Sequence, residues 1–216
     1  MRLPAGLWVA WAVVLGWGGA ASSQEGGKTR VACIGDSITY GAVVEDRANN
    51  CYPAVLGKLL GEKYEVRNFG VSGSTLLRKG DKPYWNEKAF TQATDFNPNI
   101  VVIKLGTNDT KPQNWKHKAE FEADARAMVR HFKELPGKPR VFVALPVAVV
   151  KPNFGINEEG VREEIPVLVK VAREEGAKLI DLHSAVAAKN LFAADGVHPN
   201  AAGAKKIAET VCAALK

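Results

Sequence analysis

Cysteine is scarce in this sequence, which limits both disulfide and metal chemistry. Among 216 residues there are three cysteines, Cys33, Cys51 and Cys212, too few for a disulfide framework. Cys33 lies in an apolar run, so we expect it to be a small buried hydrophobe. A bridge between Cys51 and Cys212 would need an oxidising compartment, and the sequence leaves that pairing open. No Cys, His and Asp residues stand at metal-ligand spacing, so no metal and no cofactor are expected.

Long apolar runs are absent beyond the first residues. Met1 and Arg2 precede an apolar stretch over residues 7–17, and small residues follow over 18–23. This order is typical of a secretory signal peptide, and the apolar part is short for a membrane span, although an uncleaved anchor is the alternative. We expect a signal peptide over 1–21, a flexible mature N-terminus over 22–29 and one domain over 30–216. The mature product would be exported, periplasmic or secreted, with no membrane segment.

A large charge excess of one sign is also lacking. The formal net charge is +6, and loss of a leader that contains Arg2 leaves +5 (6 − 1). Basic and acidic residues are interleaved, as in Arg162-Glu163-Glu164, which indicates solvated helix faces and argues against a nucleic-acid partner. At most the excess favours an acidic substrate such as an anionic glycan. The oligomeric state stays open.

Five short apolar runs alternate with helical segments along the chain. The runs cover residues 31–34, 64–68, 100–105, 141–145 and 178–181. The helical segments cover 52–60, 87–96, 121–135, 157–175 and 201–215. Alternation of this kind predicts an α/β fold, a three-layer αβα sandwich with a flavodoxin-like five-stranded parallel sheet.

Capping residues support the helix boundaries. Asn200 is a candidate N-cap for the last helix, and Gly61 and Gly176 are candidate stops. Pro166 stands inside the fourth helical segment, so we expect a kink there or two shorter helices.

Polar motifs follow the strands of the predicted sheet. Ser37 follows the first strand, Gly73 the second and Asn108 the third, and Asp195 and His198 come after the fifth. The carboxyl ends of parallel strands meet at one edge, where the ligand crevice of such sheets lies. We therefore expect these residues to converge.

Ser37, His198 and Asp195 together supply the groups of an activated serine nucleophile. A serine hydroxyl becomes reactive when an imidazole takes its proton, and a carboxylate must orient the imidazole. The three-residue spacing of Asp195 and His198 lets the carboxylate face the ring. Each motif also has an alternative interpretation. The turn at Gly35-Asp36-Ser37 could simply cap a helix, and Asp195 could initiate the last helix with His198 on the surface.

Joined in this order, the segments at Ser37, Gly73, Asn108 and His198 resemble the SGNH hydrolase superfamily, also called the GDSL esterase/lipase family. The resemblance covers nearly the whole mature chain. It implies that Ser37 is the nucleophile, that His198 is the base oriented by Asp195, and that Ser37 N–H, Gly73 and Asn108 form the oxyanion hole.

Two details qualify the resemblance. Gly70 competes with Gly73, which is preferred because Val71-Ser72-Gly73 matches the usual spacing of the family, and Ile38 replaces the Leu of the family name. No Gly-x-Ser-x-Gly elbow occurs, which argues against an α/β-hydrolase fold.

Other titratable residues receive structural interpretations. Asp36 and Asp109 could be paired carboxylates for glycosidic cleavage, but bonds to loop backbone N–H groups are favoured. His183 could be a second base, although only Asp181 stands near it in sequence. His117 and His131 are expected to be solvated.

Aromatic residues lie in the loops that leave the catalytic edge. Tyr84, Trp85 and Trp115 could form walls on which a sugar ring stacks, or they could be half-buried core residues. The chain resembles exported carbohydrate O-acetylesterases of the sialate O-acetylesterase and acetylxylan esterase kind. The expected function is a serine esterase that removes short acyl groups, chiefly acetyl, from a carbohydrate or small-molecule ester. A lysophospholipase or thioesterase, or a non-catalytic glycan-binding domain, is the alternative.

Overall fold

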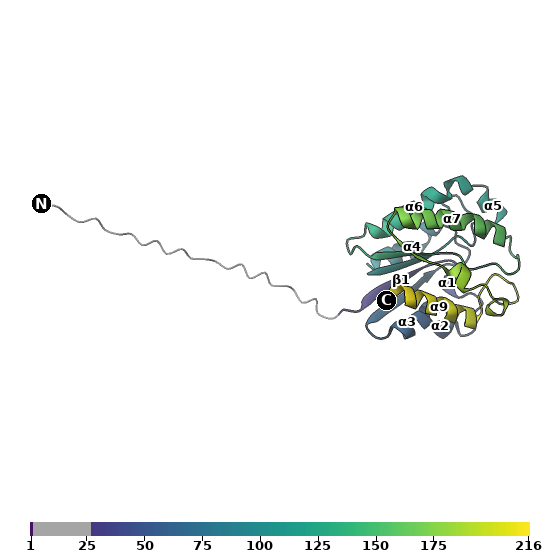
Figure 1. The fold of residues 1–216 in the computed structure, drawn as a ribbon, viewed down its shortest axis with the longest axis horizontal. Coiled ribbons are helices and arrows are strands. Elements are labelled where there is room, and N and C mark those ends of the chain that lie inside the picture. Colours follow the sequence, from purple (N-terminus) through teal and green to yellow (C-terminus); the bar gives the residue numbers. More distant parts are fainter. Residues whose placement is uncertain (2–26) are drawn as a thin grey trace.

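The computed structural model describes Met1 and residues 27–216, which form a sheet covered by helices (Figure 1). The proposed signal peptide lies outside the described residues, and Thr29 of the expected flexible lead already belongs to the first strand. The strands are β1 (Thr29–Gly35), β2 (Tyr64–Gly70), β3 (Ile100–Lys104), β4 (Arg140–Ala144) and β5 (Lys178–Ile180). All neighbouring pairs are parallel, in the order β2-β1-β3-β4-β5. The predicted five-stranded parallel sheet is confirmed.

Helices of two kinds connect the strands. The longer ones are α3 (Tyr52–Leu60), α4 (Lys88–Asp95), α6 (Phe121–Lys133), α7 (Glu158–Glu174) and α9 (Ala201–Leu215). The short ones are α1 (Ser37–Tyr40), α2 (Arg47–Asn50), α5 (Pro112–Trp115) and α8 (Leu182–Ala185), with 3₁₀ turns η1 (Tyr84–Asn86), η2 (Lys118–Glu120) and η3 (Lys189–Leu191). No helix in the described part of the chain is long and apolar enough to span a bilayer.

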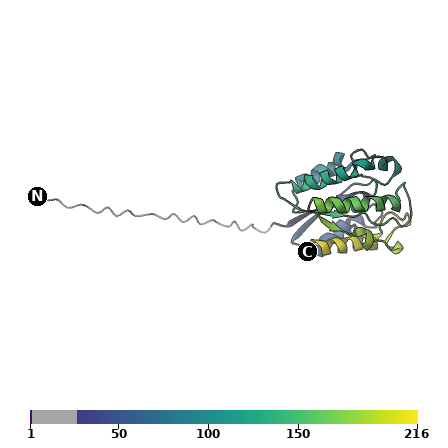
Figure 2. The ribbon, with the colours of Figure 1, turned by 45° about the horizontal axis from the view of Figure 1, so that its top comes forward.

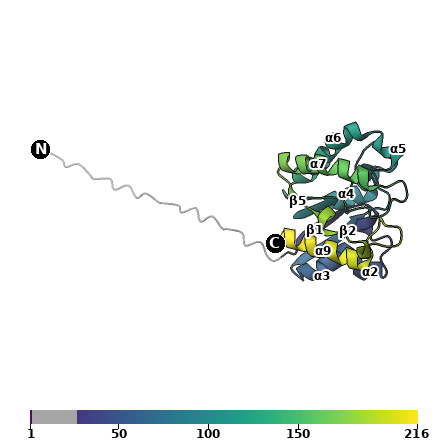
Figure 3. The same ribbon diagram turned by 45° about the vertical axis from the view of Figure 1, so that its right-hand side comes forward.

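The sheet is the middle of three layers. Helices α3 and α9 cover one face, and α4, α6 and α7 cover the other, as Figure 1, Figure 2 and Figure 3 show from three directions. Successive side chains of a strand point to opposite faces. Val31 and Cys33 of β1 therefore pack in the cluster of α3 and α9, whereas Ala32 and Ile34 pack in the cluster of α6 and α7. Burial on both faces explains why the inner strands β1, β3 and β4 have apolar runs without polar alternation.

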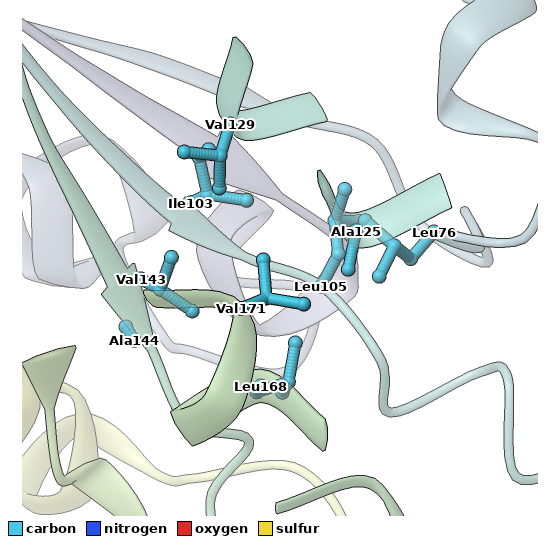
Figure 4. Close-up of a pocket in the computed structure, with 9 residues that line it drawn as sticks. All are labelled: Leu76, Ile103, Leu105, Ala125, Val129, Val143, Ala144, Leu168 and Val171. Carbon is cyan, nitrogen blue, oxygen red and sulfur yellow. The ribbon is translucent and has the colours of Figure 1, made fainter. Parts of the chain in front are cut away.

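The core between the sheet and helices α6 and α7 is closely packed. Side chains from β3, β4 and both helices point toward one another around a cavity of about 10 Å³ (Figure 4). A space of this size holds at most about one water, and its lining is apolar. A ligand site must therefore lie elsewhere.

The caps agree with the sequence, and one proline does not. Asn200 caps α9 by accepting from Gly203 N–H at 3.0 Å, Gly61 ends α3, and Gly176 follows α7 with φ 62°. Of the two alternatives expected at Pro166, a kink or two shorter helices, the second is wrong, because α7 runs uninterrupted from Glu158 to Glu174. The buried face of α7 packs on the sheet and holds the helix together despite the missing backbone donor.

All three cysteines are buried free thiols. Cys33 is fully buried among apolar side chains, as expected, and burial raises the pKa of its thiol to about 12. The structure contains no bridge between Cys51 and Cys212, so the pairing that the sequence left open is not made.

Candidate active site

Ser37 is positioned by the turn that leaves β1. Strand order reverses around β1, which pairs with β2 on one side and β3 on the other, so the loop after β1 opens into the crevice at the switch point. Asp36 caps α1 by accepting from Ile38 N–H at 2.9 Å. A side chain at Gly35 would overlap the carbonyl oxygen of Lys104, so glycine is required for the close approach of β1 and β3. Ser37 therefore stands on a rigid support.

A hydrogen-bonded relay connects Ser37 to a carboxylate. Ser37 Oγ lies 2.9 Å from His198 Nε2, and His198 Nδ1 lies 2.8 Å from Asp195 Oδ2. Asp195 Oδ1 also accepts from the backbone N–H groups of Val197 and His198, each at 2.9 Å. An alcohol, an imidazole and a carboxylate in this order can move a proton from the alcohol to the ring.

The environment of Asp195 keeps it ionised. Burial by itself would raise the pKa of the carboxyl, but hydrogen bonds from His198 N–H, Val197 N–H and the His198 ring outweigh burial and lower the pKa below its usual value. The carboxylate is then charged where an imidazole titrates, so it can stabilise a protonated His198.

A pocket of about 290 Å³ opens at this relay. Its lining consists of Ser37, Ala42, Ser72, Gly73, Asn108, Lys111, Phe154, Ile156 and His198. Ser37 N–H, at the start of α1, has no intrahelical acceptor. The buried amide of Asn108 donates one N–H to Ser74 C=O at 3.1 Å and has a second N–H available.

Gly73 and not Gly70 faces the pocket. Gly73 adopts a left-handed φ of 85°, which glycine favours. Gly70 is the last residue of β2, and its N–H donates to Asn68 Oδ1 at 2.9 Å. Ser37, Gly73 and Asn108 thus line one pocket, and their joint role as oxyanion donors stays a prediction.

Asp109 ties two pocket loops together. Its carboxylate accepts from Leu77 N–H at 2.7 Å and Leu76 N–H at 3.0 Å. Burial raises the pKa of Asp109 to about 7, although these two hydrogen bonds act in the opposite direction. The expected role of Asp36 and Asp109, to accept from loop backbone N–H groups, is confirmed.

Lys104 is a buried cation behind Ser37 that sequence reasoning missed. Its Nζ lies 3.0 and 3.2 Å from the two carboxylate oxygens of Asp36 and donates to Thr107 Oγ1 at 2.7 Å. Lys104 and Asp36 are both fully buried, and burial lowers the pKa of the lysine. The signal was present in the sequence, because Lys104 is a single charge inside the apolar run over 100–105.

Glu164 of α7 belongs to the same buried region. Neither of its carboxylate oxygens has a hydrogen-bond partner among the described residues, and a side chain at Gly106 would overlap Oε2. Burial, with further contributions from Asp109 and Asp36, raises the pKa of Glu164 well above its usual value. Glu164 thus stands behind the loop that carries Asn108, in buried surroundings that favour its neutral form.

The three aromatics expected to hold a sugar have core contacts. Tyr84 is fully buried, and its hydroxyl donates to Phe69 C=O at 2.7 Å, so the expectation of a sugar-stacking role for Tyr84 is corrected. Trp85 Nε1 donates to Leu76 C=O at 2.9 Å, and Trp115 packs on Phe121 with ring centroids 5.4 Å apart. None of the three lines the pocket.

Phe154 is the aromatic that does line the pocket. Sequence reasoning missed it because residues 146–156 follow no helical or strand period. The signal was the dipeptide Phe154-Gly155, since a glycine after a bulky residue can mark a tight turn.

His183 and His131 have partners away from the pocket. His183 Nε2 lies 2.9 Å from Glu158 Oε1, a carboxylate distant in sequence. His131 is half-buried against Phe90 at 4.6 Å and bonds Thr94 Oγ1, so the expectation of a solvated ring was wrong; burial lowers its pKa. Within residues 27–216 there is no cluster of His, Cys, Asp and Glu fit to hold a metal ion.

Two known esterases are similar to this chain in sequence. The chain is 42% identical over 206 residues to an acetylxylan esterase from Xylanibacter ruminicola, covering 87% of this chain and 43% of that protein. It is 24% identical over 220 residues to a multidomain esterase from Ruminococcus flavefaciens, covering 86% and 28%. The chain thus spans less than half the length of these relatives.

Structural similarity extends across nearly the same region. Est24, a carbohydrate acetylesterase from Sinorhizobium meliloti, shares the fold with a TM-score of 0.73 at 19% identity, covering 87% of this chain and 98% of that one. The model of the GDSL-like lipase/acylhydrolase family matches residues 33–206, which contain Ser37, Asn108, Asp195 and His198. This chain therefore belongs to the GDSL-like lipase/acylhydrolase family.

Proposed function

We propose that this protein is a serine esterase that removes acetyl groups from a carbohydrate through an acyl-enzyme on Ser37. The observation that carries the proposal is the unbroken relay from Ser37 Oγ to His198 at 2.9 Å and from His198 to Asp195 at 2.8 Å. Hydroxyl, imidazole and carboxylate need no rearrangement before reaction.

The chemistry proceeds in two halves. As Ser37 Oγ attacks the ester carbonyl, His198 Nε2 takes its proton, and Asp195 stabilises the imidazolium. The negative oxygen develops beside Ser37 N–H, Gly73 N–H and the Asn108 amide, each donor contributing about 3 to 4 kcal/mol at the transition state. His198 then protonates the leaving alcohol. Water, activated by His198, attacks the acetyl-serine and releases acetate.

Pocket size and chemistry support a small acyl group on a polar alcohol. Ala42, Ser72 and Gly73 contribute little bulk to the lining, which leaves room beside Ser37 for a small acyl group. The 42% identity to an acetylxylan esterase makes acetylated xylan the first substrate to test. A lysophospholipase would require more apolar surface, and a thioesterase remains an outcome of the test.

The proposal includes export of the protein by an N-terminal signal peptide. The order of charge, apolar run and small residues over 1–23 supports a signal peptide ending near Ala21 and a hydrolase domain from residue 30 onward. N-terminal sequencing of protein recovered outside the cytoplasm tests this assignment. An unprocessed Met1 in the exported protein would contradict it.

A substrate panel tests the activity. Purified protein is assayed on p-nitrophenyl acetate, butyrate and octanoate, on acetylated xylan, on O-acetyl sialic acid and on an acyl thioester, with Ser37→Ala as the control. We expect acetate release from acetylated xylan, and a loss of at least about a thousandfold in kcat for Ser37→Ala. Preference for octanoate or the thioester would contradict the carbohydrate substrate. Glycan binding without turnover would instead indicate a non-catalytic domain.

A further inference from the structure

A tight hairpin presents Phe154 to the pocket. Asn153 and Ile156 exchange backbone hydrogen bonds of 3.1 and 2.7 Å, and the two residues between them have positive φ, 54° at Phe154 and 78° at Gly155. A two-residue turn of this kind usually has Asn-Gly or Asp-Gly at its centre. A bulky side chain with positive φ is a backbone outlier, so Phe154 is held in a strained conformation.

The hairpin is fastened to the relay itself. Asn153 Oδ1 accepts from Phe154 N–H at 2.9 Å, and Asn153 Nδ2 donates to Asp195 C=O at 3.4 Å. The turn is thereby tied to the loop that carries the acid and the base. The position of Phe154 is fixed relative to His198.

The side chain of Phe154 is largely exposed and packs little against the rest of the protein. At 58% exposure it is the most exposed large apolar side chain among residues 27–216. Its ring stands edge-on to the imidazole of His198, with centroids 5.9 Å apart. Burial does not explain an aromatic that is both solvated and strained, because folding gains little from it. A ligand would supply the missing contact.

The direction of proton transfer indicates which part of the substrate lies beside His198 and Phe154. His198 must hand its proton to the oxygen of the leaving alcohol, so the alcohol lies beside the imidazole while the acyl group bonds to Ser37. Phe154 stands against that same imidazole and lines the same pocket. The alcohol part of the ester therefore meets the Phe154 ring.

We infer that Phe154 is a specificity-determining residue that stacks on the sugar ring of the leaving group. The inference rests on the proposed esterase function and names which part of its substrate is recognised. The apolar C–H face of a pyranose suits an exposed aromatic face. Selectivity for sugar esters over simple alkyl esters then comes from this contact.

Two esters with the same acyl group and different alcohols isolate the contribution of Phe154 to recognition of the alcohol. Wild type, Phe154→Asn and Phe154→Tyr are compared on acetylated xylo-oligosaccharide and on ethyl acetate, with acetate release as the readout. We expect the ratio of kcat/KM between sugar ester and alkyl ester to fall about tenfold in Phe154→Asn, mainly through KM on the sugar ester. Phe154→Tyr keeps the ring and should keep the ratio.

A matched variant controls for the backbone change. Lys138 also has a positive φ, 45°, in a turn and does not line the pocket. Lys138→Asn should leave the ratio unchanged. Asn suits positive φ, so Phe154→Asn should melt no lower than wild type, and its loss of selectivity cannot then arise from unfolding.

The outcomes separate this inference from the function. An equal loss on both esters would overturn it, because Phe154 would then act through His198, and an unchanged ratio would overturn it as well. Wild type active only on ethyl acetate would refute both the carbohydrate assignment and the inference. Wild type inactive on both esters would refute the proposed esterase.

Discussion

Lys104 and Asp36 form an ion pair that solvent does not reach, directly behind the turn that carries Ser37. A buried pair gains little net stability, because desolvation offsets the attraction, but removing one partner leaves an uncompensated charge. The pair also joins the end of β3 to the residue that caps α1. A change at Lys104 should therefore affect folding and the position of Ser37 together.

Replacement of Lys104 alone should destabilise the fold more than replacement of Lys104 and Asp36 together. We expect Lys104→Met to lower the free energy of unfolding by about 3 to 5 kcal/mol, because Asp36 is left charged and unpaired. Adding Asp36→Asn removes that charge and keeps an acceptor for Ile38 N–H, so most of the loss should be recovered. Urea denaturation of both single variants and the double variant measures this coupling. Additive losses would contradict it.

Glu164 should make stability depend on pH with a defined sign. Its pKa in the folded state is raised well above 4.5, so its contribution to stability is full below about pH 4.5 and is lost as the pH rises through that raised value. Glu164→Gln has no such proton, so it should gain stability relative to wild type as the pH rises, by up to about 1.4 kcal/mol per pH unit within the window. Urea unfolding at about pH 5 and about pH 8 measures the difference. A constant difference would show that Glu164 does not titrate there.

Asn108 should act at the transition state. Asn108→Ala removes one donor for the developing oxyanion, so kcat should fall by about two to three orders of magnitude with a modest change in KM. Asn190→Ala, at an exposed residue outside the pocket, is the control. Near-normal turnover of Asn108→Ala would remove this side chain from the site.

At the scale of elements, the five strands and five long helices could be predicted, because each has a local pattern of apolar residues. The four-residue helices α1, α2, α5 and α8 could not, since they are too short to show a period. The convergence of Ser37, Asn108 and His198 followed from parallel topology. Local signals mark Lys104 and Phe154-Gly155, but the partner of Lys104 and the place of the Phe154 hairpin depend on contacts between distant segments, which no local pattern encodes.

Pro166 offers a test of helix α7. It is exposed in the helix interior and provides no N–H for the carbonyl of Arg162. Pro166→Ala restores that donor, and after the entropy that proline removes from the unfolded chain is subtracted, we expect a gain of about 2 kcal/mol, or roughly 4 to 8 °C in Tm. Pro112→Ala, in the first turn of α5, should give no gain. Equal effects of the two changes would contradict the explanation.

At the scale of the whole molecule, all three thiols are buried, and Cys33 and Cys212 lie in the apolar cluster between the sheet and helices α3 and α9. Cys33, Cys51 and Cys212 are 0, 4 and 6% exposed. Reaction with a thiol reagent therefore requires opening of the core, and labelling reports global rather than local stability.

Thiol titration tests this arrangement. We expect little rapid reaction of the native protein, three reactive thiols in denaturant without reductant, and a Tm that reductant does not change. A single reactive thiol in the denatured, unreduced protein would show that two of the three cysteines had paired and would contradict the arrangement.

The sequence separation of 161 between Ser37 and His198 also sets the order in which the relay forms during biosynthesis. The strand that supports the serine is made early, whereas the imidazole emerges only after β5 has been translated. Until that last crossover docks, the hydroxyl has no proton acceptor and keeps the low reactivity of any free serine. Ser37 of a nascent chain therefore does not react with esters before the fold is complete.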